Sequence, residues 1–136
     1  MKLSKKPTAA RISNGYRSGL EQKIAQSLLD AGVDFTYEDQ VIHYTKPEKI
    51  ARYTPDFVLA NGIIIEVKGR FLTQDRQKHL LVKQQRPELD IRFVFSRSKE
   101  RISKKSKTTY AMWCEKHGFL YADETIPEHW LQEPPK

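Results

Sequence analysis

Apolar residues recur every four positions near the start of the chain, in "SGLEQKIAQSLLDAG". Leu20, Ile24 and Leu28 form one apolar stripe, which predicts an amphipathic helix. Ser18 is a natural N-cap, and Gly32 is placed to end the helix. Glu21 stands three residues after Ser18, as in a capping box, so by itself it indicates a helix cap and no chemistry.

Runs of β-branched and aromatic residues predict strands along most of the remaining chain. Further helical patterns occur in "TQDRQKHLLVKQQ", in "TTYAMWCEKHG" and, as one short turn, in "IPEHWLQEPPK". We expect strands in a continuous segment from about 35 to 45, in the hairpin "RYTPDFVL" and "IIIEVKG", in "DIRFVFS" and in "FLYAD". This order of elements predicts an α/β fold with a mixed β-sheet flanked by helices.

The hairpin carries acids where apolar residues would be expected, and its turn decides how they face. A two-residue loop at 61–62 would place Asp56 on the opposite face from Glu66. A three-residue loop at 60–62, with Gly62 in the left-handed conformation, would place Asp56 directly opposite Glu66. We predict the second register or an equivalent bulge.

Two carboxylates that face each other across neighbouring strands repel, so they need a compensating charge. Lys68 lies on the same face as Glu66 and supplies one positive charge. A divalent cation, Mg²⁺ or Mn²⁺, would supply more, because hard oxygen ligands suit these ions. An ion-pair cluster on a solvated sheet face is the alternative, but "IIIEVKG" is apolar at both parities before Glu66, which indicates burial.

Composition limits the class of protein. The chain has 136 residues and a formal charge of +7, which fits one domain with a polyanionic partner, nucleic acid first and an anionic membrane surface second. The single cysteine, Cys114, excludes an internal disulfide framework and favours a reducing, cytoplasmic location. No apolar window is long enough to cross a membrane, and the basic N-terminus lacks the apolar region of a secretory signal. The four histidines show no metal-ligand spacing with Cys114, and we expect no small-molecule cofactor.

Longer segments of the sequence resemble a known family. Pro55-Asp56 followed by Glu66-Val67-Lys68 is the PD-(D/E)XK signature of a large nuclease superfamily. Together with "YRSGLE", "DRQKHLLVKQQRPELDIRFVFS", "CEKHGFLYAD" and "IPEHWLQEP", this signature resembles the phage endonuclease I family, the junction-resolving nucleases of T-odd phages. The resemblance runs from about Arg17 to Pro134.

The resemblance implies a PD-(D/E)XK nuclease-like fold and a homodimer that exchanges N-terminal segments across a β-bridge. It implies cleavage of four-way (Holliday) and branched DNA by paired nicks, in the cytoplasm of a host cell for a phage protein. Residues 1–17 carry basic residues and no acid, a pattern that predicts a flexible basic N-terminal arm. For the single nuclease domain at 18–136, the resemblance implies an exchanged segment at 18–45, a bridge or hinge at 46–52 and a catalytic core at 53–136.

The resemblance also implies the site. The catalytic residues are Glu21, Asp56, Glu66 and Lys68. The implied ligands of two Mg²⁺ ions, replaceable by Mn²⁺, are Asp56, Glu66, the Val67 backbone carbonyl and Glu21. The chain departs from the family at Thr36, where the family has an acid, although Glu38 follows two residues along on the same predicted strand face.

Basic residues are the candidates for contacts with DNA phosphates. They are Arg17, Arg70, Arg76, Arg97, Lys99, Arg101, Lys104, Lys105 and Lys107. Three alternatives stay open from the sequence: a restriction-type or mismatch-type nuclease on the same fold, a non-catalytic nucleic-acid-binding domain, and an RNA-binding basic domain.

Overall fold

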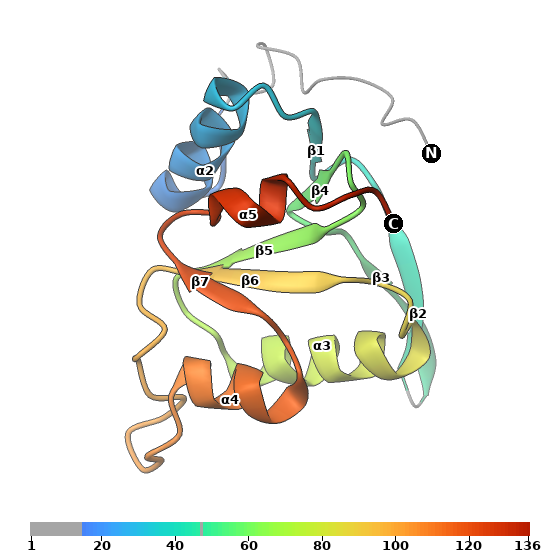
Figure 1. Cartoon of the computed structure of the whole chain (residues 1–136). Helices are drawn as coiled ribbons and strands as arrows, with labels where there is room; N and C mark the ends of the chain where they lie inside the picture. The colour runs from blue at the N-terminus through green and yellow to red at the C-terminus, as the bar shows by residue number, and fades with distance from the viewer. Residues whose placement is uncertain (1–14, 47) are drawn as a thin grey trace.

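The structure, a computed structural model, describes residues 15–46 and 48–136, and it has the predicted mixed sheet with helices on both faces (Figure 1). The helices are α2 (Gly19–Asp30), α3 (Thr73–Gln85), α4 (Tyr110–His117) and α5 (Glu128–Leu131). The strands are β1 (Phe35–Tyr37), β2 (Ile42–Lys46), β3 (Lys49–Tyr53), β4 (Phe57–Leu59), β5 (Ile64–Lys68), β6 (Ile91–Phe95) and β7 (Tyr121–Asp123). The predicted α/β class is therefore confirmed.

Five strands form the main sheet in the order β1-β4-β5-β6-β7. The pairs from β1 to β5 are antiparallel, and β5, β6 and β7 run parallel. Figure 1 shows α2 and α5 on one side of this sheet and α3 and α4 on the other. Each side has its own hydrophobic cluster, with Ile24 and Trp130 in the first and Val82 and Trp113 in the second. Both tryptophans are buried, as expected of core residues.

The turn between β4 and β5 has the predicted three-residue form. The Leu59 N–H donates to the Ile63 carbonyl at 2.8 Å, and Gly62 has a φ of 92°. That positive φ is costly for a residue with a side chain, which explains the glycine. The ladder pairs Phe57 with Ile65, and its extension by one further pair beyond these residues places Asp56 opposite Glu66.

The prediction of one continuous strand from about 35 to 45 was wrong. β1 ends at Tyr37, because Glu38 has a φ of 47°, which an extended strand cannot accommodate. β2 begins only at Ile42 and pairs with β3 in a separate two-stranded sheet. Backbone and side-chain amides of Thr45 and Gln85 hydrogen-bond to each other and hold this hairpin against α3.

A charged network closes the carboxyl end of the described chain, and we call its four residues, Asp90, Arg92, Glu133 and Lys136, the C-terminal clamp. The Arg92 guanidinium lies 2.8 Å from an Asp90 carboxylate oxygen and 2.6 Å from one of Glu133. Lys136 Nζ lies 2.7 Å from Asp90. Burial alone would raise the pKa of Asp90, but hydrogen bonds to Arg92 and Lys136 outweigh it and lower that pKa. The pKa of Glu133 is lowered, chiefly by its hydrogen bond to Arg92.

Two predicted features fall wholly or partly outside the described residues. Most of the basic arm predicted at 1–17 lies there, and so does Pro47 of the predicted hinge. Over residues 15–46 and 48–136, the structure contains no helix with the length and apolar character needed to span a membrane.

Candidate metal centre

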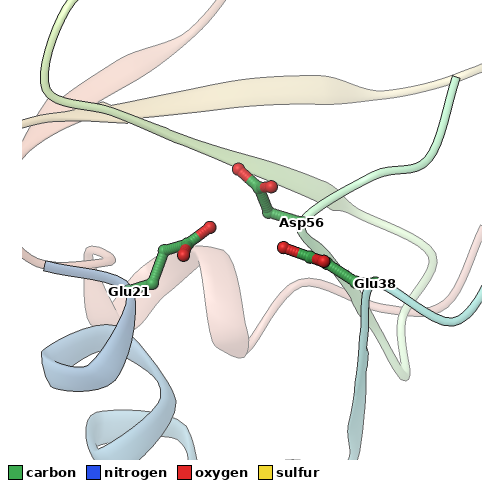
Figure 2. A group of neighbouring side chains, drawn as sticks. All are labelled: Glu21, Glu38 and Asp56. Atoms are coloured by element: carbon green, nitrogen blue, oxygen red, sulfur yellow. The ribbon is translucent and has the colours of Figure 1, made fainter. Parts of the chain in front are cut away.

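Three carboxylates meet at one end of the β1–β4 strand pair, and we call them the carboxylate cluster: Glu21, Glu38 and Asp56. One oxygen from each lies within 4.8 Å of one from each of the others. Figure 2 shows Glu21 approaching from α2, Asp56 from the segment just before β4, and Glu38 from the residue just after β1. Segments far apart in sequence therefore supply the three side chains.

Glu21 is not a simple helix cap. Its backbone N–H donates to the Ser18 hydroxyl oxygen at 3.0 Å, which is the predicted N-cap bond. Its carboxylate instead accepts a hydrogen bond from the Tyr37 hydroxyl at 2.9 Å, away from Ser18. The pKa of Glu21 is raised, because burial and the neighbouring Glu38 charge disfavour its ionised form.

Glu38 joins the cluster through an uncommon backbone conformation. Its left-handed φ turns the chain out of β1, while its N–H donates to the Asp56 carbonyl at 3.1 Å. Arg17 Nε lies 3.0 Å from its carboxylate. Sequence reasoning placed Glu38 on the same strand face as Thr36, but Thr36 is buried within β1. The left-handed conformation of Glu38, which no local sequence motif predicts, accounts for the different positions of Glu38 and Thr36.

Asp56 is held by the neighbouring strand. Its Oδ2 accepts a hydrogen bond from the Val67 N–H at 2.9 Å. Burial and the negative charge of Glu66 raise its pKa, with a smaller contribution from Glu21. An acid with a raised pKa at the edge of a sheet, among other acids, is typical of a site that a cation completes.

Glu66 lies opposite Asp56, but its carboxylate is enclosed by the protein and only 2% of the residue is exposed. Oε2 accepts hydrogen bonds from the Tyr53 hydroxyl at 2.7 Å and from the Asp56 N–H at 3.1 Å. Burial alone would raise the pKa of Glu66, but His79, Lys68 and Tyr53 outweigh it and hold the pKa below its ordinary value. The structure thus brings Glu38, and not Glu66, into the group of three. Metal binding by Glu66 and by the Val67 carbonyl stays a prediction.

Lys68 lies between two acids. Its Nζ is 3.7 Å from Glu66 Oε1 and 3.7 Å from Asp75 Oδ1. Burial works against its charge, but the surrounding carboxylates raise its pKa above the ordinary value. Lys68 is therefore an ammonium group at neutral pH, beside the carboxylates it was predicted to accompany.

His79 is a neighbour of the site that sequence reasoning did not single out. It is fully buried on α3, and its Nε2 lies 3.6 Å from Glu66 Oε1, beyond ordinary hydrogen-bond distance. Burial lowers the pKa of His79, while the neighbouring Glu66 carboxylate acts in the opposite direction. The spacing of His79 from Val82 on the inner face of α3 was the available signal, and that signal indicates burial and nothing more.

The predicted DNA-contact residues divide into three groups. Arg70, Arg101 and Lys104 line one pocket beside the end of β5, together with Gly69. Arg76 instead donates to the Phe71 carbonyl and the Thr73 hydroxyl at the start of α3. The remaining members lie exposed on the surface: Arg17, Arg97, Lys99, Lys105 and Lys107.

The donor chemistry of the carboxylate cluster fits a divalent cation. Carboxylate oxygens from Glu21, Glu38 and Asp56 are the hard ligands that Mg²⁺ and Mn²⁺ prefer. Among the described residues, Arg17 forms an ion pair with this cluster, through Glu38. Its side chain is 80% exposed, so solvent weakens its compensation of the negative charge of the acids. The fold and this site define an α/β protein with an acidic, partly buried edge suited to such an ion.

Comparisons with known proteins give the family. The chain matches the phage endonuclease I family over residues 3–136 and belongs to it. It is 52% identical over 130 residues to endodeoxyribonuclease 1 of Enterobacteria phage T3, a match that covers 94% of this chain and 86% of the relative. It is 49% identical over 126 residues to endonuclease I of Escherichia phage T7, covering 93% of this chain and 85% of that relative. The resemblance noted from the sequence is thereby confirmed, and the family supports a phage-type endonuclease.

Proposed function

We propose that this protein is a Mg²⁺-dependent endodeoxyribonuclease of the PD-(D/E)XK type that cleaves branched DNA, four-way junctions above all. The observation that carries the proposal is the convergence of Glu21, Glu38 and Asp56 beside Glu66 and Lys68, in a chain that belongs to the phage endonuclease I family. The T3 relative is named an endodeoxyribonuclease, which supports DNA as the substrate.

The ligands that would hold two Mg²⁺ ions are Asp56, Glu66, the Val67 carbonyl, Glu21 and, as an addition from the structure, Glu38. When bound, divalent ions activate a water molecule and neutralise the charge that develops on the reacting phosphate. Mn²⁺ should substitute, because its ligand preferences are similar.

Side chains of the site have separate tasks in this mechanism. Asp56 is held by the Val67 N–H, so its free oxygen keeps a fixed direction toward the other acids. Lys68, kept charged by Glu66 and Asp75, is suited to orient the scissile phosphate by charge. The high pKa of its ammonium group makes it a poor general base.

The β2–β3 hairpin supports a homodimer formed by segment exchange. Glu21 and Glu38 precede this hairpin in the chain, and Asp56 follows it. If the turn between β2 and β3 opened, α2 and β1 of one chain would make the same contacts on the partner, which is the geometry of a domain swap. Each site would then combine acids from two chains, and two sites related by a twofold axis could nick opposed strands.

The pocket lined by Arg70, Arg101 and Lys104 lies beside the end of β5, next to Lys68. Such a group of cations binds phosphates without reading bases, because the charge of the DNA backbone is independent of sequence. This favours binding of DNA that is independent of base sequence.

A cleavage assay tests the proposed function. Purified protein should cut a four-way DNA junction in Mg²⁺, stop cutting in excess chelator, and cut a linear duplex of the same sequence much more slowly. Binding of the junction without cleavage in Mg²⁺ or Mn²⁺ would show a non-catalytic binding protein. A strong preference for one base sequence in linear DNA would point to a restriction-type nuclease, and equal affinity for duplex RNA to an RNA-binding domain.

Segment exchange has its own test, a mixed dimer of Glu21→Gln and Asp56→Asn chains produced by co-expression. Each parent should be inactive. With exchange, one site of the mixed dimer receives Glu21 from one chain and Asp56 from the other, so single-strand nicking returns. Without exchange, every site lacks one acid and the mixture stays inactive.

A further inference from the structure

Tyr53 links the two-stranded hairpin sheet to the acid that lies deepest in the site. It is the last residue of β3 and is 1% exposed. Its hydroxyl donates to Glu66 Oε2 at 2.7 Å, across from β5 of the main sheet. The hydroxyl of a hairpin residue thus reaches a carboxylate of the candidate metal centre.

The oxygen that Tyr53 binds also accepts the Asp56 N–H at 3.1 Å. Tyr53 and Asp56 lie three residues apart, so two donors of one short segment hydrogen-bond to Glu66 Oε2. The last torsion of a glutamate side chain is broad, and a single hydrogen bond constrains it poorly. Two donors at one oxygen fix the plane of the carboxylate and leave Oε1 on the side of Lys68 and His79.

The Tyr53 ring is itself held in place. It meets the His79 ring edge-on, with 5.3 Å between ring centroids, and Lys78 Nζ lies over its face at 5.7 Å from the centroid. The hydroxyl therefore has little freedom to move away from Glu66, and its position follows that of the hairpin.

We propose that Tyr53 is a positioning residue, whose hydroxyl sets the orientation of Glu66 and so couples the seating of the β2–β3 hairpin to metal binding and cleavage. This inference rests on the proposed function. A purely structural tyrosine would affect stability alone, whereas a positioning tyrosine changes metal affinity and rate through Glu66.

The test is Tyr53→Phe, which removes only the hydroxyl, with Tyr44→Phe as the matched control. Tyr44 is a buried tyrosine of the paired strand β2 and belongs to the same hydrophobic cluster. Loss of a group that orients a metal ligand costs about 10- to 100-fold in metal affinity or activity. Tyr53→Phe should therefore bind Mn²⁺ at least about 10-fold more weakly without DNA and cleave correspondingly slower. Its affinity for a junction in chelator should equal that of Tyr44→Phe.

Comparing Glu66→Gln with the double variant Tyr53→Phe/Glu66→Gln tests whether Tyr53 affects Mn²⁺ affinity through Glu66. In a Glu66→Gln background, Tyr53→Phe should cause no further loss of Mn²⁺ affinity, because the group it orients is already gone. The inference is overturned if Tyr53→Phe matches Tyr44→Phe in Mn²⁺ affinity and in rate per folded molecule, or if the two substitutions act additively. A wild-type protein that binds Mn²⁺ but never cuts DNA would refute the proposed function, while the Mn²⁺ measurements would still decide the role of Tyr53.

Discussion

Two groups of acidic residues lie at different places in this molecule and are treated in opposite ways. In the C-terminal clamp, Arg92 lies 2.8 Å from Asp90 and 2.6 Å from Glu133, and Lys136 lies 2.7 Å from Asp90. In the carboxylate cluster, three acids converge and the described chain gives them the exposed Arg17. The pKa is lowered for both acids of the clamp and raised for Glu21 and Asp56 of the cluster.

The difference separates acids that serve the fold from acids that, under the proposed function, serve a ligand. The acids of the clamp have their own cationic partners, Arg92 and Lys136. The acids of the cluster lie close together with little cationic compensation, and their raised pKa values are typical of a functional site. Each of the following predictions would either break this contrast or sharpen it.

The largest effect is expected at Asp56. Asp56→Asn keeps an oxygen that can accept the Val67 N–H but removes the charge from the cluster. The cleavage rate should fall on the order of 10³-fold, as for other groups that stabilise charge in a transition state, while junction affinity persists. Asp90→Asn, which removes a charge from the clamp, should leave the rate per folded molecule unchanged. Equal losses in the two variants would erase the contrast between the groups.

The next effect is on stability and belongs to the clamp. Arg92 is 4% exposed, so Arg92→Ala leaves two acids without their main partner. The free energy of unfolding should fall by about 3 kcal/mol, because Arg92 makes charge-assisted hydrogen bonds to two partly exposed acids and such bonds contribute about 1.5–3 kcal/mol each. Arg17→Ala, at the exposed cation of the cluster, should cost less than about 1 kcal/mol. Denaturation in urea measures both, and a larger loss for Arg17→Ala would contradict the assignment of roles.

A bound cation should stabilise the cluster and not the clamp. At a Mn²⁺ concentration 100 times its dissociation constant, the free energy of unfolding should rise by about 2.7 kcal/mol. Thermal unfolding with and without Mn²⁺ measures this gain. It should vanish in Asp56→Asn and persist in Asp90→Asn. A gain that survives in Asp56→Asn would place the ion elsewhere.

The smallest effect is a dependence on acid pH. The pKa values of Asp90 and Glu133 in the folded protein lie below the ordinary values of 3.8 and 4.5. Their contribution to stability is therefore complete above the ordinary values and is lost as the pH falls through the lowered ones. Urea denaturation from pH 6 to pH 2 should show the wild type approaching Arg92→Ala at the acid end. A constant difference across this range would mean that the clamp acids are not the cause.

Much of the fold could be predicted because local signals decided it. The stripe of Leu20, Ile24 and Leu28 predicted α2, and the position of Gly62 predicted the register that sets Asp56 opposite Glu66. The Asn-Gly sequence allowed two loops. A two-residue hairpin loop would need a positive φ at Asn61, whereas in the structure Gly62 has a positive φ and Asn61 does not, as the three-residue form requires.

The rest of the site depends on contacts between distant segments. The sequence alternates as a strand should only up to Glu38, and residues 38–40 are all polar. That interruption is consistent with the end of β1, but it does not predict the left-handed conformation that brings Glu38 toward Asp56. Tyr53 and His79 look like ordinary core residues along the chain, and only packing brings them to Glu66. The family resemblance identified the acids that lie in short sequence motifs. It did not identify Glu38, Tyr53 and His79, which only the tertiary structure brings next to those acids.

Under the proposed function, the left-handed backbone at Glu38 sets stability against activity. A residue with a side chain in this conformation costs about 1–2 kcal/mol relative to glycine. Selection for heat resistance alone would therefore favour Gly or Asn at this position and discard an acid of the cluster. Variants selected for thermal stability should also be assayed for cleavage rate, because the most stable of them are expected to have lost the acid at position 38.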